Sequence, residues 1–303
     1  MDELAYWYTE WISDGVVESF RVIKPFYRGR TSYQRLEILE TEPYGPCLLL
    51  DGKMQSSLLD EHIYHETLVH PAMCLSGEPR RVVIIGGGEG AALREVLRWQ
   101  TVEEVFLIDL DREVVELCQK YLPQLSSGAF HDPRVRLFFE DGRNWVAEKL
   151  AGNVDVFIVD VTDPLEHGPS YLLYTSEFYS LLHSKLSENG VVATHATSPT
   201  HTPLAYQSIK KTMQTAFTNV SELATFIISF SSVWGFLYGS KKRGLESLGG
   251  VEVDRILIRA GVRGLRFYGG ATHEALRELT RHYVGLRSVE PRVIRDSEPL
   301  FIV

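Results

Sequence analysis

The sequence predicts an α/β protein in which a small N-terminal β domain precedes a larger domain built on a doubly wound sheet. Three observations predict this fold. Residues 5–57 carry strand and turn signals without any long segment of helical period. From residue 61 onward, short apolar segments alternate with helical segments, which is typical of a mostly parallel sheet covered by helices. The first apolar segment, 81–85, runs into the glycine-rich turn Gly86-Gly87-Gly88-Glu89-Gly90.

The N-terminal β domain is expected over residues 1–60. Polar and apolar side chains alternate at 33–40, as they do along a strand with one buried face. Turn residues follow at 43–46, then a short apolar strand at 47–50. Asp51-Gly52 after that strand is a hairpin signal.

The larger domain is expected over residues 61–303. It opens with a helix at 62–73, and strands are expected at 81–85, 104–109, 135–139, 154–160 and 190–195. Further helices are expected at 90–99, 112–121, 143–150, 176–187 and 203–217. Late strands at 222–229 and 233–239 and a helix at 272–285 complete the edge of the sheet. Residues 241–270 are rich in Gly and Arg and lack a clear period, so we expect an irregular C-terminal extension from about residue 241.

The composition excludes several classes of protein. The 303 residues carry a net charge of −9, which argues against nucleic acid as a partner and suits a cationic small molecule, although an acidic surface also serves solubility. Cys47, Cys74 and Cys118 form no CxxC pair, so neither a disulfide framework nor a zinc–thiolate site is expected. The sequence shows no secretory signal and no apolar run long enough to span a bilayer. We therefore expect a cytoplasmic protein with no membrane partner.

The glycine turn fits two nucleotide-binding patterns. Gly86-x-Gly88-x-Gly90 has the spacing of adenosylmethionine-binding folds, and Gly86-x-Gly88-x-x-Ala91 also satisfies a dinucleotide fingerprint. In both, an acid at the end of the next strand accepts hydrogen bonds from the ribose hydroxyls, a role that Asp109 fits. The alternative is that Asp109 only caps the helix beginning at 112.

Glu89 favours a sulfonium nucleoside over a dinucleotide. In a dinucleotide site this carboxylate would face a pyrophosphate at a helix N-terminus and repel it. A sulfonium nucleoside that carries an amine has no phosphate and would be attracted. Asp141-Gly142, after the strand at 135–139, lies where an acid can bind an adenine amino group.

A second pair of acids follows the strand at 154–160. Asp160 ends that strand and Asp163 precedes Pro164. Two neighbouring carboxylates at a strand end suit the binding of a diamine or the removal of a proton from an ammonium group. The alternative is that Asp163 only makes a turn with Pro164. Tyr171 and Tyr174 follow and can supply apolar walls with a polar tip.

The histidines of the first helix do not predict a metal site. His65-Glu66 and His70 read HETLVH, which separates the histidines by five positions, whereas HExxH zinc sites need four. The inverted order HxxEH is also absent, because the chain reads HIYHE. We expect no metal and no prosthetic group.

The motifs together resemble polyamine aminopropyltransferases, the spermidine and thermospermine synthase family. The resemblance covers almost the whole chain to about residue 240 and is carried by Tyr33-Gln34, LLLDGKMQSS, DEHIYHETLVHP, VIIGGGEGAALREVL, LIDLD, DPRV, EDGR, VDVTDP, GPSYLLYTSEFY and WGF at 234–236. It implies a Rossmann-like, methyltransferase-type catalytic domain after the N-terminal β domain, in a homodimer or homotetramer.

The resemblance also implies the reaction and the roles of particular residues. Decarboxylated S-adenosylmethionine would donate an aminopropyl group to a polyamine acceptor and leave as methylthioadenosine. The implied nucleoside-binding residues are Gln34, Gln55, Gly86, Gly88, Asp109, Asp141, Gly142 and Pro169. The implied amine-binding residues are His65, Glu89, Asp160, Asp163, Tyr174 and Trp234. Asp160 would accept the proton of the attacking amine, with Tyr64 and Asp163 holding that amine.

The sequence leaves the acceptor open among putrescine, agmatine and spermidine. Glu89 stands where the commonest spermidine synthases have Asp, DVTDP replaces DSSDP, and Asp109 replaces a ribose-binding Glu. Two other function classes remain as alternatives: a small-molecule methyltransferase that uses adenosylmethionine, and a non-catalytic protein that binds a polyamine or a nucleoside.

Overall fold

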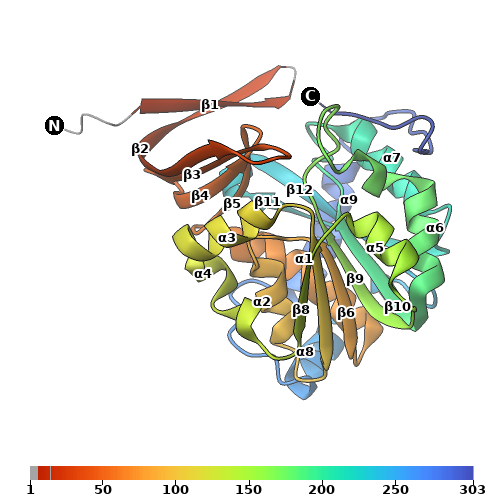
Figure 1. Ribbon diagram of the computed structural model, residues 1–303. Helices are drawn as coiled ribbons and strands as arrows, with labels where there is room; N and C mark the ends of the chain where they lie inside the picture. The colour runs from red at the N-terminus through yellow and green to blue at the C-terminus, as the bar shows by residue number, and fades with distance from the viewer. Residues whose placement is uncertain (1–5, 14, 303) are drawn as a thin grey trace.

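Two β-sheets organise the chain, as Figure 1 shows. The structure is a computed structural model that describes residues 6–13 and 15–302. The first sheet has the order β1-β2-β3-β4-β5 and the second the order β11-β12-β10-β9-β6-β7-β8. In the described part of the chain, no helix is both long and apolar enough to cross a membrane.

The N-terminal sheet is an antiparallel meander. Its strands are β1 (Tyr6–Ser13), β2 (Val16–Arg30), β3 (Arg35–Thr41), β4 (Gly45–Leu50) and β5 (Lys53–Ser57). Asp51 and Gly52 have φ of 47° and 88°, as a two-residue hairpin turn between twisted strands requires. The hairpin predicted there is therefore confirmed, while residue 5 of the predicted β region lies outside the described residues.

The second sheet has a parallel centre and an antiparallel edge. Its strands are β6 (Arg81–Gly86), β7 (Glu104–Asp109), β8 (Val135–Phe139), β9 (Val154–Asp160), β10 (Leu186–His195), β11 (Asn219–Ile227) and β12 (Ser232–Ser240). Strands β6 to β10 are parallel, and β12 pairs antiparallel with both β10 and β11. The strand order reverses between β6 and β9, which is where such sheets bind ligands.

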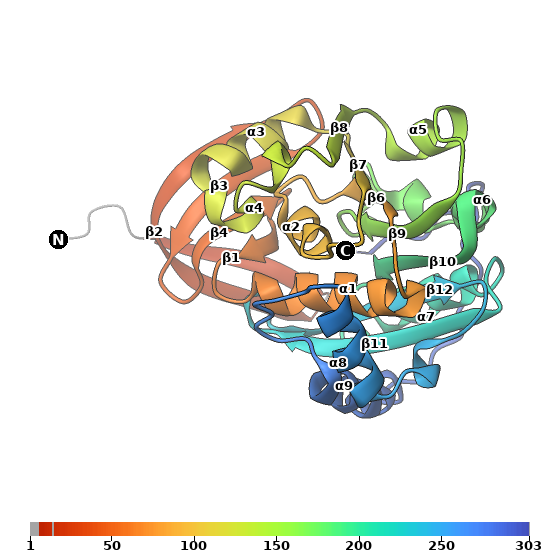
Figure 2. The same cartoon turned by 90° about the horizontal axis from the view of Figure 1, so that it is seen from below.

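Helices cover both faces of this sheet. They are α1 (Glu61–Ser76), α2 (Ala91–Leu97), α3 (Arg112–Tyr121), α4 (Pro123–Ser126), α5 (Gly142–Glu148), α6 (Ser176–Lys185), α7 (Pro203–Met213), α8 (Gly250–Arg259) and α9 (Gly270–Val284). Apolar side chains of α1, α2, α8 and α9 share one core with one face of the sheet, and those of α5, α6 and α7 share another with the opposite face. Figure 2 shows α8 and α9 on the side of α1 away from β6 and β7.

A third core joins the N-terminal sheet to α2, α3 and α4, helices that flank the second sheet. Leu36 and Ile38 of β3 and Leu48 of β4 are buried together with Val114 and Cys118 of α3. At roughly 25 cal/mol per Å² of apolar surface removed from water, a shared core of this kind disfavours separation of the sheets. The groove between the sheets thus has two fixed walls.

The expectation of an irregular segment at 241–270 was wrong, because this segment contains α8. Val253, Ile256 and Leu257 form a buried stripe at helical spacing that the neighbouring glycines and arginines obscured. Asp254 then fixes α8 against α9 by accepting a hydrogen bond from Gly270 N at 2.7 Å. Gly250 and Gly270 lie so close that a Cβ on Gly250 would sit 2.6 Å from the oxygen of Gly270.

A single buried carboxylate attaches the C-terminal segment to α1. Glu66 is 1% exposed and accepts hydrogen bonds from the backbone N–H groups of Arg266, Phe267 and Tyr268 at 2.8, 2.8 and 2.7 Å. The glutamate of the histidine-rich helix is therefore occupied by the protein's own backbone.

We expect Glu66→Ala to lower the free energy of unfolding by roughly 3 kcal/mol, because three buried N–H groups lose an ionised acceptor. Urea unfolding followed by circular dichroism measures this change. Glu78→Ala is the matched control, since the Glu78 side chain is 63% exposed in its pair with Arg259. A loss for Glu66→Ala no larger than that of the control would contradict the role assigned to this carboxylate.

Candidate active site

A deep pocket lies between the N-terminal sheet and the carboxyl ends of β6, β7 and β9. Thirteen of the predicted site residues line it: Gln34, Gln55, Tyr64, Gly86, Gly88, Glu89, Asp109, Asp141, Gly142, Asp160, Asp163, Pro169 and Trp234. His65 and Tyr174 lie behind the lining. Residues separated by almost two hundred positions in the sequence thus meet at one edge of the sheet.

The glycine turn lies tightly against the end of β9. Gly86 pairs with Asp160 across the parallel strands, and Gly87 N donates to Asp160 O at 2.7 Å. Gly86 has φ of 80°, and a Cβ there would lie 2.1 Å from that oxygen. Only glycine fits this position without moving the backbone.

Asp109 and Asp111 have different roles: one faces the glycine turn and the other caps a helix. Asp111 accepts a hydrogen bond from Glu113 N at 3.1 Å, so it caps α3, and the alternative that Asp109 is the cap was wrong. Asp109 instead faces the glycine turn, since a Cβ on Gly88 would lie 2.6 Å from its Oδ2. Burial, followed by the neighbouring charges of Asp111 and Glu89, raises the pKa of Asp109 to about 7.

Asp111 is one of the carboxylates at the strand ends, but its contact with the N-terminal domain was not predicted from the sequence. It is 3% exposed and accepts hydrogen bonds from Thr31 Oγ1 at 2.6 Å and from Gln34 Nε2 at 3.1 Å. The amide of Gln34 is therefore positioned by a residue of the other sheet. The second Asp of the LIDLD motif was the available signal.

Asp141 and Gly142 lie where β8 leads into α5. Asp141 caps that helix by accepting from Asn144 N at 2.8 Å, and it also lines the pocket. A Cβ on Gly142 would lie 2.5 Å from Ile85 Cγ2, so this glycine permits close packing of α5 against β6.

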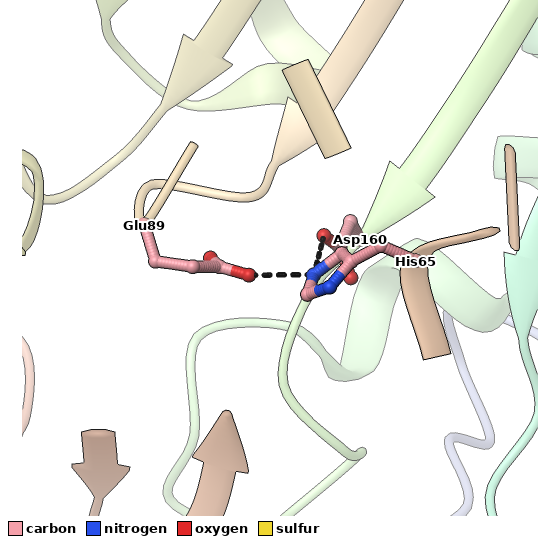
Figure 3. A group of neighbouring side chains, drawn as sticks. All are labelled: His65, Glu89 and Asp160. Carbon is pink, nitrogen blue, oxygen red and sulfur yellow. Dashed lines mark hydrogen bonds and ion pairs between the residues drawn. The ribbon is translucent and has the colours of Figure 1, made fainter. Parts of the chain in front are cut away.

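His65, Glu89 and Asp160 form a compact charged cluster beside the glycine turn (Figure 3). His65 Nε2 lies 2.8 Å from Glu89 Oε1 and 3.8 Å from Asp160 Oδ2. Its Nδ1 lies 2.8 Å from the Glu61 carbonyl oxygen. Because a carbonyl only accepts and a carboxylate accepts best, both ring nitrogens act as donors.

The protonation of this cluster follows from its hydrogen bonds. Burial alone would lower the pKa of His65, but the hydrogen bonds to Glu61 and Glu89 outweigh burial and raise that pKa well above its usual value. Burial, followed by the charge of Glu89, raises the pKa of Asp160 to about 7. Tyr64 donates to Asp160 Oδ1 at 2.9 Å, while Oδ2 is buried without a hydrogen-bond partner.

The same three side chains could meet around a metal ion, since their ligand atoms lie within 4.8 Å of one another. A metal would require a neutral His65, whereas its two acidic neighbours favour the imidazolium form. The arrangement fits ion pairing and an ammonium ligand better than a metal. That the site holds no metal stays a prediction.

Asp163 points into the pocket and does not use its side chain for the turn with Pro164. The turn is made by its backbone, because Leu165 N donates to Asp163 O at 2.8 Å. Asp163 Oδ1 is buried and has no hydrogen-bond partner, and burial raises the pKa of this carboxyl to about 7. The alternative of a purely turn-forming side chain was wrong.

Tyr174, like His65, is a predicted amine-binding residue that does not line the pocket. It is fully buried, and its hydroxyl donates to Thr162 O at 3.1 Å and lies 2.9 Å from His195 Nε2. Its role is to support the loop after β9 and the ring of His195.

Three further acidic or basic residues of the lining had no role predicted from the sequence: Glu10, Lys53 and His195. Glu10 lies on β1, is 6% exposed, and accepts from Met54 N at 3.1 Å. Burial raises its pKa to about 7. Nothing in the sequence of β1 places it beside residues 150 positions away.

The pocket as a whole is strongly acidic. Seven carboxylates line it, those of Glu10, Glu89, Asp109, Asp111, Asp141, Asp160 and Asp163, against the single ammonium of Lys53. Burial destabilises the ionised form of these carboxylates, and a cation that enters the pocket stabilises that form again. An acidic lining of this kind suits a positively charged ligand.

Comparison with known proteins identifies the family of the chain. The chain matches a spermine/spermidine synthase domain over residues 61–247 and a spermidine synthase tetramerisation domain over residues 6–57. It is 42% identical to polyamine aminopropyltransferase 2 of Hyperthermus butylicus over 294 residues, covering 97% of this chain and 96% of that one. It is 37% identical to the polyamine aminopropyltransferase of Saccharolobus solfataricus, with 98% of each chain covered.

Solved structures agree with this likeness. A spermidine synthase in complex with the transition-state analogue AdoDATO superposes with a TM-score of 0.84 at 30% identity, covering 93% of this chain and 96% of that one. The spermidine synthase of Thermotoga maritima gives 0.83 at 30% identity, with 93% and 95% covered. The family, the fold class and the transferase class predicted from the sequence are confirmed. The chain belongs to the spermine/spermidine synthase family of polyamine aminopropyltransferases.

Proposed function

We propose that this enzyme transfers the aminopropyl group of decarboxylated S-adenosylmethionine to an amino group of a polyamine acceptor. The observation that carries the proposal is the register of β6 and β9, which sets Asp160 directly opposite the glycine turn. A nucleoside on that turn would present its sulfonium side chain to Asp160 and Glu89. Methylthioadenosine and a longer polyamine are the products.

The residues divide between the two substrates. For the donor nucleoside we propose Gln34, Gln55, Gly86, Gly88, Asp109, Asp141, Gly142 and Pro169, all of which line the pocket. For the amine groups we propose His65, Glu89, Asp160, Asp163 and Trp234. The family match and the acidic lining support this division.

Asp160 is proposed as the proton acceptor. Tyr64 holds its Oδ1, which leaves Oδ2, 3.8 Å from His65 Nε2 and without a hydrogen-bond partner, for the acceptor amine. The acceptor nitrogen forms a bond to the aminopropyl carbon as the carbon–sulfur bond breaks, and the electron pair of that bond leaves with sulfur as a neutral thioether. The proton released by nitrogen passes to Asp160. In-line alignment of nitrogen, carbon and sulfur provides most of the rate enhancement.

The same charges select the donor. Ordinary adenosylmethionine carries an α-carboxylate that would meet Glu89 and Asp160, and repulsion between like charges in a buried site disfavours it. The decarboxylated form has only the ammonium group at that end. This contrast argues against the alternative of an adenosylmethionine-dependent methyltransferase.

We propose that residues 1–60 form a domain that assembles the protein into a homodimer or homotetramer. The match to a tetramerisation domain over 6–57 supports this, and α1 begins at Glu61. Trp7, Trp11 and Val17 on β1 and β2 are 69%, 60% and 51% exposed, an apolar surface suited to a subunit contact. Three buried free cysteines support a reducing cytoplasm as the compartment.

A product assay tests the function and identifies the acceptor. The enzyme is incubated with decarboxylated S-adenosylmethionine and putrescine, agmatine or spermidine in turn, and separately with adenosylmethionine. We expect methylthioadenosine and a longer amine with at least one acceptor, resolved by liquid chromatography and mass spectrometry that separates spermine from thermospermine. S-adenosylhomocysteine as the sole product would establish a methyltransferase instead, and no product with any amine would favour a binding protein.

We expect Asp160→Asn to lower kcat by roughly 100-fold or more, the usual scale for loss of a general base. Binding of methylthioadenosine, measured by calorimetry, should change by less than about threefold, because Asn preserves the shape of the side chain. Glu116→Gln, at an exposed position of α3, serves as the control. Turnover close to wild type in Asp160→Asn would remove this residue from proton transfer.

We expect kcat/KM for the amine to rise with pH through about 7. Asp160 and Asp163 each have a pKa raised to about 7, and each can bind or deprotonate an ammonium group only after losing its own proton. With two such groups, the slope of log(kcat/KM) on the acid side should exceed one. Initial rates from about pH 5.5 to about pH 9 at saturating donor measure this slope.

In Asp163→Asn, the slope of log(kcat/KM) on the acid side should fall to about one, because only Asp160 then has to lose a proton. A profile that is flat between about pH 6 and about pH 8, or an unchanged slope in Asp163→Asn, would contradict the assignment.

A further inference from the structure

His195 is a buried, pocket-lining residue to which neither the sequence nor the family match assigns a role. It ends β10, is 2% exposed, and lies between the loop after β9 and the indole of Trp234. Its ring is parallel to that of Trp234 within 24°, with 5.9 Å between the centroids. Because buried polar atoms in proteins are normally hydrogen-bonded, each nitrogen of this ring is expected to have a partner.

The Nε2 atom of His195 is a donor. It lies 2.5 Å from the carbonyl oxygen of Val161, which can only accept, so Nε2 carries the hydrogen. Tyr174 donates its own hydroxyl hydrogen to Thr162 O, which leaves its oxygen free to accept from the same Nε2. Burial lowers the pKa of His195 to about 4, so the ring is neutral near pH 7 and Nδ1 presents a lone pair.

That lone pair faces another acceptor. His195 Nδ1 lies 3.8 Å from Asp163 Oδ1, and both atoms are buried without a hydrogen-bond partner in the described part of the chain. The separation is too long for a direct hydrogen bond. Two unpaired acceptors in a buried site are costly unless a ligand supplies donors to both.

One nitrogen with two hydrogens has the right geometry. N–H bonds on a tetrahedral nitrogen diverge and hydrogen bonds tolerate some bending, so two acceptors that it reaches lie roughly 4 to 5 Å apart, close to the separation of 3.8 Å found here. A primary or secondary alkylammonium meets this condition. A quaternary ammonium has no N–H bond to offer, and a tertiary ammonium has one.

The backbone around His195 is held rigidly. Thr197, two residues later, has φ of 64°, an unfavourable conformation for a β-branched residue. Two hydrogen bonds to β12 maintain it: Ala196 N donates to Gly235 O at 2.8 Å, and Gly235 N donates to Thr197 O at 2.9 Å. Backbone strain of this kind persists where the surrounding structure fixes a functional position.

We propose that His195 Nδ1 and Asp163 Oδ1 together bind one ammonium nitrogen of the amine acceptor, an inference that rests on the proposed function. The neutral imidazole adds a hydrogen-bond acceptor without adding a second negative charge. The subsite therefore recognises the number of N–H bonds on the nitrogen, whereas Asp163 alone would recognise only its charge.

Two variants separate the two nitrogens of the ring. The amide of Asn places a polar atom where Nδ1 lies, and the amide of Gln places one where Nε2 lies. We expect His195→Gln to raise KM for the acceptor by about 10- to 100-fold, the loss of one hydrogen bond to a charged group. Its kcat and its affinity for methylthioadenosine should stay within about twofold of wild type. His195→Asn should restore KM to within about threefold.

Three results would overturn the proposal. They are an unchanged KM in His195→Gln, an equal rise of KM in both variants, or a fall of kcat and of methylthioadenosine affinity in parallel with the rise of KM. The last pattern would make His195 a structural support for Tyr174.

A crystal structure of the wild-type enzyme with methylthioadenosine and its acceptor decides the question if neither variant folds. An acceptor nitrogen within about 3.2 Å of both Nδ1 and Oδ1 supports the proposal, and a nitrogen bound elsewhere contradicts it. Failure of the proposed function is a separate observation, because wild-type enzyme would then form no methylthioadenosine with any amine.

Discussion

The hydrogen bond from Gly87 N to Asp160 O joins the two halves of the active site. It fixes the glycine turn of β6 against the end of β9 at the point where the strand order of the sheet reverses. A side chain on Gly86 would collide with the same oxygen, so the turn and the acidic strand end are mutually dependent. The positions proposed for the nucleoside and for the reacting amine both depend on this contact.

The charges around that contact are held in an unusual balance. Glu10 is buried and Asp109, Asp160 and Asp163 are partly buried, and loss of contact with water raises the pKa of each to about 7. His65 supplies an internal positive charge, but Glu61, Glu89 and Asp160 surround it, so negative charge remains in excess. A cationic ligand would neutralise the negative charge that remains in excess. Recognition of the substrate and activation of the base therefore have the same physical origin.

The central fold and much of the site could be predicted because both depend on local patterns. The hairpin at Asp51-Gly52 and the glycine turn before α2 have short sequence signals, and acids at the ends of parallel strands meet at one edge of a sheet. Helix α8 escaped prediction because its buried stripe is embedded in glycine- and arginine-rich sequence.

Residues that act through long-range contacts could not be predicted. Glu10 reaches the pocket because the N-terminal sheet packs on helices of the second sheet, and no local pattern pairs Asp111 with Thr31 and Gln34. Tyr174 has the composition of a pocket wall, yet its hydroxyl is directed to Thr162 and His195. His195 resembles any buried histidine until the direction of each ring nitrogen is known. A sequence shows which side chains can donate, accept or carry charge, but the hydrogen-bond partner of each buried polar atom is set by the fold.

The excess of carboxylates beside the glycine turn implies that this pocket recognises a positive charge next to the nucleoside. Calorimetric titration of the wild-type enzyme with methylthioadenosine, adenosylmethionine and decarboxylated S-adenosylmethionine measures this recognition. We expect the decarboxylated donor to bind at least about tenfold more tightly than either of the others, and Glu89→Gln to reduce this advantage. Equal or tighter binding of adenosylmethionine would show that these carboxylates do not select the donor by its charge.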